Sequence, residues 1–200
     1  MIARVAVLAA LAVLIAGCDS DDDSTGSAGD VPITAPGLAY VAADHVGRPD
    51  VAGVDELDWF DAFADDAVAV DLRYHPTKNY PGDSVTVTLG TLRVPDLLDC
   101  DATVGMYTQG CAETPDGTLR WNLDDPEEDP GGVFVLVPKS DGQTVLVTFN
   151  GPRIHRDPRK VDLPVSVDTV FEIANDPRLD VTTSEHVENN GIELPYQAAG

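Results

Sequence analysis

The sequence predicts a β-rich α+β domain, built on an antiparallel sheet or a sandwich with two or three short helices. One observation is that about six or seven short segments alternate apolar with polar or β-branched residues, as half-buried strands do. A second is that proline, glycine, asparagine and aspartate lie between these segments and favour turns. A third is that segments with the spacing of a helix are few and short.

The clearest hairpin joins residues 133–137 to residues 144–149 through a turn at Ser140, Asp141 and Gly142. Residues 68–74 and 84–94 predict two further strands, and the glycine in the second is a candidate β-bulge. Residues 104–111 and 118–123 predict another pair, with Thr114-Pro-Asp-Gly117 as the turn between them. Residues 161–167 predict a last strand or edge segment.

Three segments predict helices. Residues 55–64 carry apolar side chains three and four apart, with acidic residues in the first turn. Ser166 or Asp168 is expected to cap a helix that runs through Ala174, and residues 184–190 predict a final helical turn that ends at Gly191. Residues 38–42 fit a first strand or a short helical turn, and the sequence leaves this choice open.

The N-terminus has the pattern of an export signal. Arg4 precedes a run of apolar residues, 5–16, that is shorter than the roughly 20 residues a membrane-spanning helix needs. The run ends in Leu14-Ile-Ala-Gly-Cys18, which resembles the lipobox of bacterial lipoproteins. That resemblance implies cleavage after Gly17, attachment of a diacylglycerol to the Cys18 thiol, and anchoring at the extracytoplasmic face of the cell membrane. In layout and composition the chain also resembles the small secreted lipoproteins of actinobacteria that have no assigned activity.

These features divide the chain into three parts. Residues 1–17 are expected to be a signal peptide, residues 18–30 the lipid-attachment cysteine with a disordered acidic tether, and residues 31–200 one β-rich globular domain. Loss of Arg4 with the signal leaves 11 basic against 35 acidic residues, a net charge of −24. Such a chain repels nucleic acid, so we expect no nucleic-acid partner, and we expect lipid rather than surface charge to hold it on the membrane.

Cysteine usage agrees with export. If Cys18 carries lipid, Cys100 and Cys111 remain as an even pair, and an oxidising compartment favours a disulfide between them. Two free buried thiols are the alternative. The spacing matches neither a CxxC redox motif nor a zinc site.

One short segment departs from the general acidity. Four of the 11 positive charges of the mature chain lie between residues 153 and 160, and a histidine lies among them. The segment is a candidate contact for an anionic group or a partner protein, and pairing with the protein's own carboxylates is the alternative that we favour. The residues are Arg153, His155, Arg156, Arg159 and Lys160.

The segment from residue 122 to residue 132 is dense in oxygen ligands and is a weak calcium candidate. It fails the EF-hand pattern, because Pro130 and Leu136 stand where glycine and glutamate are required, and a solvated acidic turn is the alternative that we favour. The candidate ligands are Asp124, Asp125, Glu127, Glu128 and Asp129.

No catalytic motif is present: the sequence lacks GxSxG, SxxK and HExxH, and its four histidines lie in polar or loop-like segments. We therefore predict a membrane-anchored, non-enzymatic binding or accessory module without cofactor, whose partner is an envelope protein or polymer. A cell-envelope hydrolase with a spatially assembled carboxylate or Ser/His site is the alternative. A deep pocket that holds a histidine beside a carboxylate would favour the hydrolase.

Overall fold

The computed structural model describes residues 31–54, 62–78, 80, 82–102, 108–125, 130–194 and 196–197. Its main sheet has eight strands in the order β10-β2-β3-β4-β8-β7-β6-β5. Seven strands, β2 to β8, are antiparallel to their neighbours, and β10 runs parallel to β2 at one edge. The strands are β2 (Val51–Val54), β3 (Val68–Tyr74), β4 (Asp83–Gly90), β5 (Gly110–Thr114), β6 (Gly117–Asn122), β7 (Gly132–Pro138), β8 (Thr144–Asn150) and β10 (Tyr196–Gln197).

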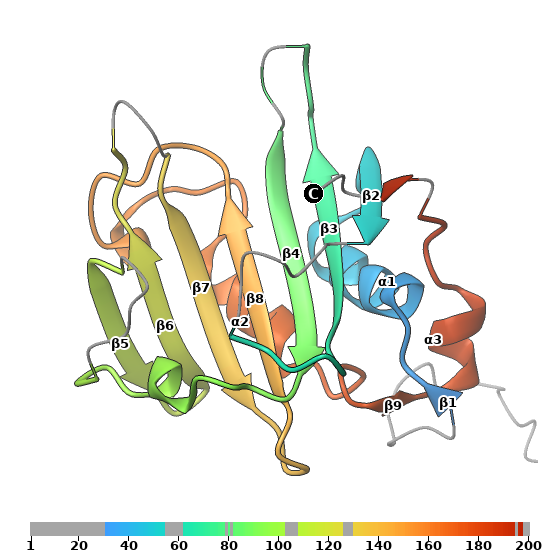
Figure 1. Ribbon diagram of the computed structural model, residues 1–200. Helices are drawn as coiled ribbons and strands as arrows, with labels where there is room; N and C mark the ends of the chain where they lie inside the picture. The colour runs from blue at the N-terminus through green and yellow to red at the C-terminus, as the bar shows by residue number, and fades with distance from the viewer. Residues whose placement is uncertain are drawn as a thin grey trace, which may run out of the picture.

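Two helices cover one face of this sheet. Helix α1 (Ala35–Val46) packs on β3 and β4, and helix α2 (Val167–Asn175) packs on β7 and β8, both behind the strands as drawn in Figure 1. Helix α3 (Glu185–Asn189) contacts α1, and a separate antiparallel pair joins β1 (Val31–Pro32) to β9 (Thr182–Thr183). The described residues also form two 3-10 helices, Pro95–Leu98 and Pro158–Lys160. The predicted β-rich α+β class is thus confirmed, in the form of a mostly antiparallel main sheet with three short α-helices.

Each helix begins at a hydroxyl side chain that accepts a hydrogen bond from the first turn. The Thr34 hydroxyl accepts from the Gly37 amide at 3.5 Å, the Ser166 hydroxyl from the Thr169 amide at 3.0 Å, and the Ser184 hydroxyl from the Val187 amide at 3.3 Å. The two predicted C-terminal helices are therefore confirmed, with Ser166 as the cap of α2. The open choice at residues 38–42 resolves as the middle of α1. Among the described residues no helix has the length and apolarity to cross a membrane.

The alternation along the strands sorts side chains onto two different faces. Every second residue of the central strands is buried beneath the helices, in a core of valine, leucine and phenylalanine. The opposite face carries a smaller apolar cluster and buried polar residues. That cluster contains Ala62, Phe63, Leu97, Phe134, Leu136 and Leu146, and the polar residues include Asp71, Thr88, Arg120 and Thr148.

Several strand predictions are confirmed and one is wrong. The β7–β8 hairpin is present as predicted. The β5–β6 pair also turns at the predicted place, but β5 shares only residues 110 and 111 with the strand predicted at residues 104–111. The predicted strand at residues 161–167 is absent: Leu163, Val165 and Val167 are buried alternately, but the segment pairs with no described strand. Gly90 ends β4 and forms no bulge. Most of the helix predicted at residues 55–64, and residues 104–107 of a predicted strand, lie outside the described residues.

Candidate functional site

The cationic segment 153–160 follows β8, as predicted, and one buried residue fixes it to the fold. Ile154 is fully buried, its amide donates to the Pro130 carbonyl at 3.0 Å, and its carbonyl accepts from the Asp124 amide at 2.8 Å. The charged neighbours of Ile154 therefore lie at the surface beside the end of β6.

Four of the five predicted cationic residues face carboxylates of the same chain. Asp124 receives the Arg153 guanidinium at 3.4 Å and the His155 ring nitrogen at 2.9 Å. Asp157 receives Arg159 at 2.8 Å and Lys160 at 3.5 Å. These contacts agree with the alternative in which the segment pairs with the protein's own carboxylates.

Two further features mark the segment. The Arg159 guanidinium lies 5.5 Å from the centre of the Trp121 ring, a distance at which a cation is attracted to the ring face. Hydrogen bonds from the Arg159 side chain, opposed by burial, lower the pKa of Asp157 to about 2. Arg156 is exposed and makes no salt bridge with a carboxylate among the described residues. A contact between this segment and an anionic partner stays a prediction.

The acidic turn is described only in part. Asp124 is engaged by Arg153 and His155, and Asp125 is exposed, whereas Glu127, Glu128 and Asp129 lie outside the described residues. Within the described ranges no group of three or more His, Cys, Asp or Glu side chains is arranged to hold a metal ion. The calcium candidate therefore gains no support from Asp124, whose oxygens already face the Arg153 guanidinium and the His155 ring.

Cys100 and Cys111 lie at disulfide-bonding distance, with sulfur atoms 1.94 Å apart and Cα atoms 5.5 Å apart, as their even count predicts. The disulfide ties β5 to the segment that contains Cys100. In this segment the Cys100 amide also donates to the Glu113 carboxylate at 3.1 Å. The third cysteine, Cys18, lies outside the described residues.

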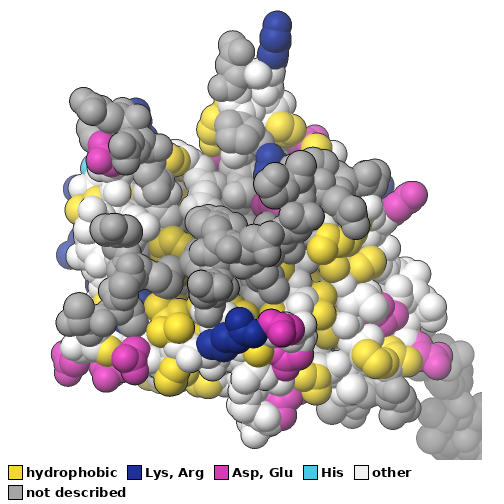
Figure 2. Space-filling view, in the orientation of Figure 1, with side chains coloured by type: hydrophobic (Ala, Val, Ile, Leu, Met, Phe, Trp, Pro, Cys, Tyr) yellow, Lys and Arg dark blue, Asp and Glu magenta, His cyan; other side chains and the backbone are white. Residues whose placement is uncertain are grey.

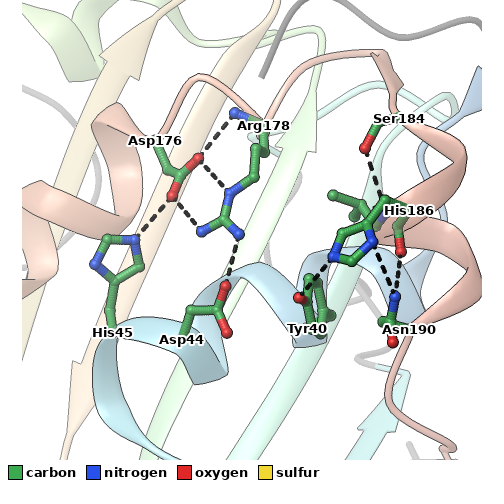
Figure 3. A network of polar contacts seen from close by, with 9 residues as sticks. Tyr40, Asp44, His45, Asp176, Arg178, Ser184, His186 and Asn190 are labelled. Atoms are coloured by element: carbon green, nitrogen blue, oxygen red, sulfur yellow. Dashed lines mark hydrogen bonds and ion pairs between the residues drawn. The ribbon is translucent and has the colours of Figure 1, made fainter. Parts of the chain in front are cut away.

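The largest charge network of the described residues was not foreseen. Asp176, just after α2, accepts from the His45 ring at 2.9 Å and from the Arg178 guanidinium at 2.8 Å and 3.0 Å (Figure 3). Arg178 also donates to Asp44 at 2.6 Å. Asp44 and His45 belong to the last turn of α1, so the network joins the end of α1 to the segment that follows α2.

The contacts of the network stabilise the charged forms of Asp176 and Arg178. Burial alone would favour the neutral form of Asp176, but hydrogen bonds from Arg178 and His45 outweigh it and hold the pKa of this carboxyl below its ordinary value of 3.8. The hydrogen bonds that Arg178 donates to Asp176 raise the pKa of the Arg178 guanidinium above its ordinary value. The Lys139 ammonium group donates to the backbone carbonyl oxygen of Asp176 at 3.4 Å. Burial lowers the pKa of this ammonium group, and the charges of nearby carboxylates oppose that shift.

The His45–Asp176 pair resembles two members of a hydrolytic triad, which is the arrangement that the hydrolase alternative needs. A triad also requires a nucleophilic hydroxyl or thiol at the second ring nitrogen. No serine, threonine or cysteine among the described residues hydrogen-bonds to His45. The pair connects the last turn of α1 to the segment after α2.

The three other histidines make separate contacts. The Tyr40 hydroxyl lies 3.3 Å from a ring nitrogen of His186, in α3, and the two rings meet edge to face (Figure 3). The His75 amide donates to the Asp50 carboxylate at 2.7 Å, and the exposed His155 contacts Asp124. Two of the four histidines belong to helices: His45 lies in the last turn of α1, and His186 lies in α3, where a helical turn was predicted.

An open depression of about 410 Å³ lies at the turn between β5 and β6. It contains no histidine, so it is not the pocket that would favour a hydrolase. Its walls are Leu98, Glu113, Thr114, Pro115, Asp116, Gly117, Thr118, Val137, Pro138 and Asn175.

Sequence reasoning missed the Asp176 network because its members come from opposite ends of the chain. His45 and Asp176 are 131 residues apart, and Arg178 and Asp44 are 134 apart. The one local signal was the pattern Asp-x-Arg at residues 176 and 178. This pattern permits an ion pair between the two side chains but does not identify a partner on another helix.

In comparisons with known proteins, no family model, no curated protein and no solved structure matches the chain.

Proposed function

We propose that this chain is a lipoprotein held at the extracytoplasmic face of the cell membrane by lipid on Cys18, and that its β-rich part binds a partner in the cell envelope without catalysing a reaction. The observation that carries the proposal is the motif Leu14-Ile-Ala-Gly-Cys18 after a short apolar run. The two acyl chains of a diacylglycerol meet the requirement for stable anchoring.

Charge and chain order support the same proposal. With a mature net charge of −24, the protein is repelled by anionic headgroups, so a covalent lipid is the attraction that remains. Thirteen residues, 18–30, separate the lipid from β1, and an extended chain of that length reaches roughly 40 Å. A β-rich part on such a tether stands clear of the headgroups.

The anchoring half of the proposal is tested in a bacterial host that processes lipoproteins. Wild-type protein should partition into the detergent phase of a cloud-point extraction and should have the mass of residues 18–200 plus the acyl groups. The Cys18→Ala variant should stay in the aqueous phase without added mass. A double variant, Cys100→Ser with Cys111→Ser, is the matched control and should keep the lipid. Aqueous partitioning of the wild type would contradict the proposal.

The binding half is tested by crosslinking intact cells that carry the wild-type or the Cys18→Ala protein. A partner in the envelope should be crosslinked to the anchored wild type and much less to the released variant. Equal crosslinking of both forms would show that anchoring does not place the protein beside its partner.

A further inference from the structure

The two edge strands of the main sheet differ in length. At one edge the last strand is β10, which is two residues long and pairs with β2 in parallel. At the other edge β5 is the last strand, and no described strand pairs with its outer side (Figure 1). An uncovered edge presents unpaired backbone groups to any extended chain.

The register fixes which groups of β5 point outward. The Lys139 amide donates to the Gln143 carbonyl at 2.8 Å, which directs the odd-numbered residues of β7 toward β8 and the even-numbered ones toward β6. Carried through β6, the same alternation turns Gly110, Ala112 and Thr114 toward β6. The amides and carbonyls of Cys111 and Glu113 therefore point away from the sheet.

The surroundings of this edge are strongly acidic. Exposed carboxylates come from β5, from its turn and from the segment that the disulfide ties in front of it, and Figure 2 shows acidic side chains gathered at this lower left corner. Arg120 adds no exposed positive charge here, because the residue is only 3% exposed and its guanidinium donates to the carbonyl oxygens of Asp96, Leu97 and Asp99. The exposed acidic residues are Asp96, Asp99, Asp101, Glu113 and Asp116.

The depression described above adjoins the edge. It shares Glu113 and Thr114 with β5, and Leu98, Val137 and Pro138 supply apolar wall. An added strand at β5 would therefore meet carboxylates and an apolar recess together.

From this combination we propose that the outer edge of β5 binds an extended, basic peptide segment of another protein, which adds to the sheet as a ninth strand. The inference rests on the binding function proposed above and names its site and the chemistry of its partner. Hydrogen bonds from the outward groups of Cys111 and Glu113 hold the backbone, and lysine or arginine side chains meet the carboxylates. A second copy of this chain does not fit, because pairing two β5 edges brings the same carboxylates together.

The experiment uses the full-length chain in a non-ionic detergent and a fluorescein-labelled hexapeptide of alternating lysine and valine. Binding is followed by fluorescence anisotropy. A hexapeptide of alternating glutamate and valine should not bind. A lysine–valine hexapeptide with every backbone nitrogen methylated should bind at least tenfold more weakly, because it has no amide hydrogen to donate to a strand edge.

Matched variants at one position separate backbone pairing from charge. Glu113→Ala removes the carboxylate and keeps the outward N–H, whereas Glu113→Pro removes both and leaves the bonds to β6 in place. We expect the Kd for the lysine peptide to rise about threefold in Glu113→Ala and at least a further fivefold in Glu113→Pro, the loss of roughly one hydrogen bond. Glu185→Ala, at an exposed residue of α3, is the control and should not change the Kd.

Hydrogen exchange on the wild-type chain keeps the test independent of how well the proline variant folds. Saturating lysine peptide should slow exchange of the Cys111 and Glu113 amides at least tenfold. Unchanged exchange at these amides, or equal Kd values for Glu113→Ala and Glu113→Pro, would overturn the proposal and would indicate diffuse attraction to an acidic surface. Failure of lipidation at Cys18 would overturn the anchoring proposal and leave this result unaffected.

Discussion

Replacing Asp176 by asparagine is the sharpest test of the network that joins α1 to the segment after α2. The side chain of Asp176 is 7% exposed, and its two oxygens accept from His45, from the Arg178 guanidinium and from the Arg178 amide. Asparagine keeps the shape and one acceptor, but it loses the charge and presents an NH₂ group to two donors.

The size of the effect follows from burial. Removing one partner of a buried ion pair costs about 3–5 kcal/mol. The side chains of His45 and Arg178 are 22% and 26% exposed, and Arg178 keeps its contact with Asp44, so water and the second carboxylate recover part of the loss. We expect the free energy of unfolding to fall by about 2–3 kcal/mol.

Urea unfolding at pH 7, followed by far-UV circular dichroism, measures this change. With a slope near 2 kcal/mol/M, the midpoint of Asp176→Asn should lie about 1–1.5 M below that of the wild type. Asp162→Asn, at an exposed aspartate in the same part of the chain, is the matched control and should shift the midpoint by less than about 0.3 M. Equal midpoints for the two variants would refute the reasoning.

The pH dependence gives the same test a second readout. The pKa of Asp176 is lower in the folded chain than its ordinary value of 3.8, so its contribution to stability is complete above that value. The contribution is lost as the pH falls through the folded-state pKa. The gap between wild type and Asp176→Asn should therefore narrow as the pH falls below about 3.8.

Three further predictions concern the packing of the sheet. Arg120→Lys keeps the charge but cannot reproduce the guanidinium fork on three carbonyl oxygens, so thermal unfolding should show a loss of about 2 kcal/mol. Replacing Cys100 and Cys111 together by serine opens a short loop and should cost about 2–3 kcal/mol in urea, whereas unchanged stability would indicate that the disulfide constrains nothing. Gly90→Ala should cost about 1–3 kcal/mol by calorimetry, because the new Cβ would lie 2.5 Å from the Cβ of Ala67, and an unchanged melting temperature would contradict this steric argument.

The sheet was predictable where neighbouring segments determine their own pairing. The β7–β8 hairpin joins two alternating apolar runs through a short turn, and its pairs extend without a break from the turn, at Pro138 and Thr144, to Gly132 and Asn150. The helices α2 and α3 were predictable for a similar reason, because Ser166 and Ser184 mark their starts within one turn. All of these signals are local.

The failures occurred where distant residues decide the structure. Residues 161–167 alternate because Leu163, Val165 and Val167 reach the core, yet Pro164 lacks an amide hydrogen and no strand lies beside the segment among the described residues. An early glycine made α1 ambiguous, since glycine disfavours a helix. In the fold, Glu188 of α3 bonds to Thr34 and lies within 2.2 Å of where a Cβ of Gly37 would be.

The candidate sites divide in the same way. The cysteine pair was predictable by counting, and the cationic segment by composition, because both are properties of the sequence itself. That Arg153 and His155 share Asp124 could be argued only as an alternative, since the partner lies on another connection. The open edge at β5 follows from strand order, which local patterns do not specify.

The small β1–β9 pair has a mechanical consequence if the chain is anchored through its N-terminus. A pulling force that enters at Val31 first loads β1, which is two residues long, and the adjacent hydrogen bond from the Ile33 amide to the Val181 carbonyl at 3.1 Å. Part of the load then passes to β9, which belongs to the small pair and not to the eight-stranded sheet. Under tension the two strands of the β1–β9 pair would therefore separate before force reaches the strands of the main sheet.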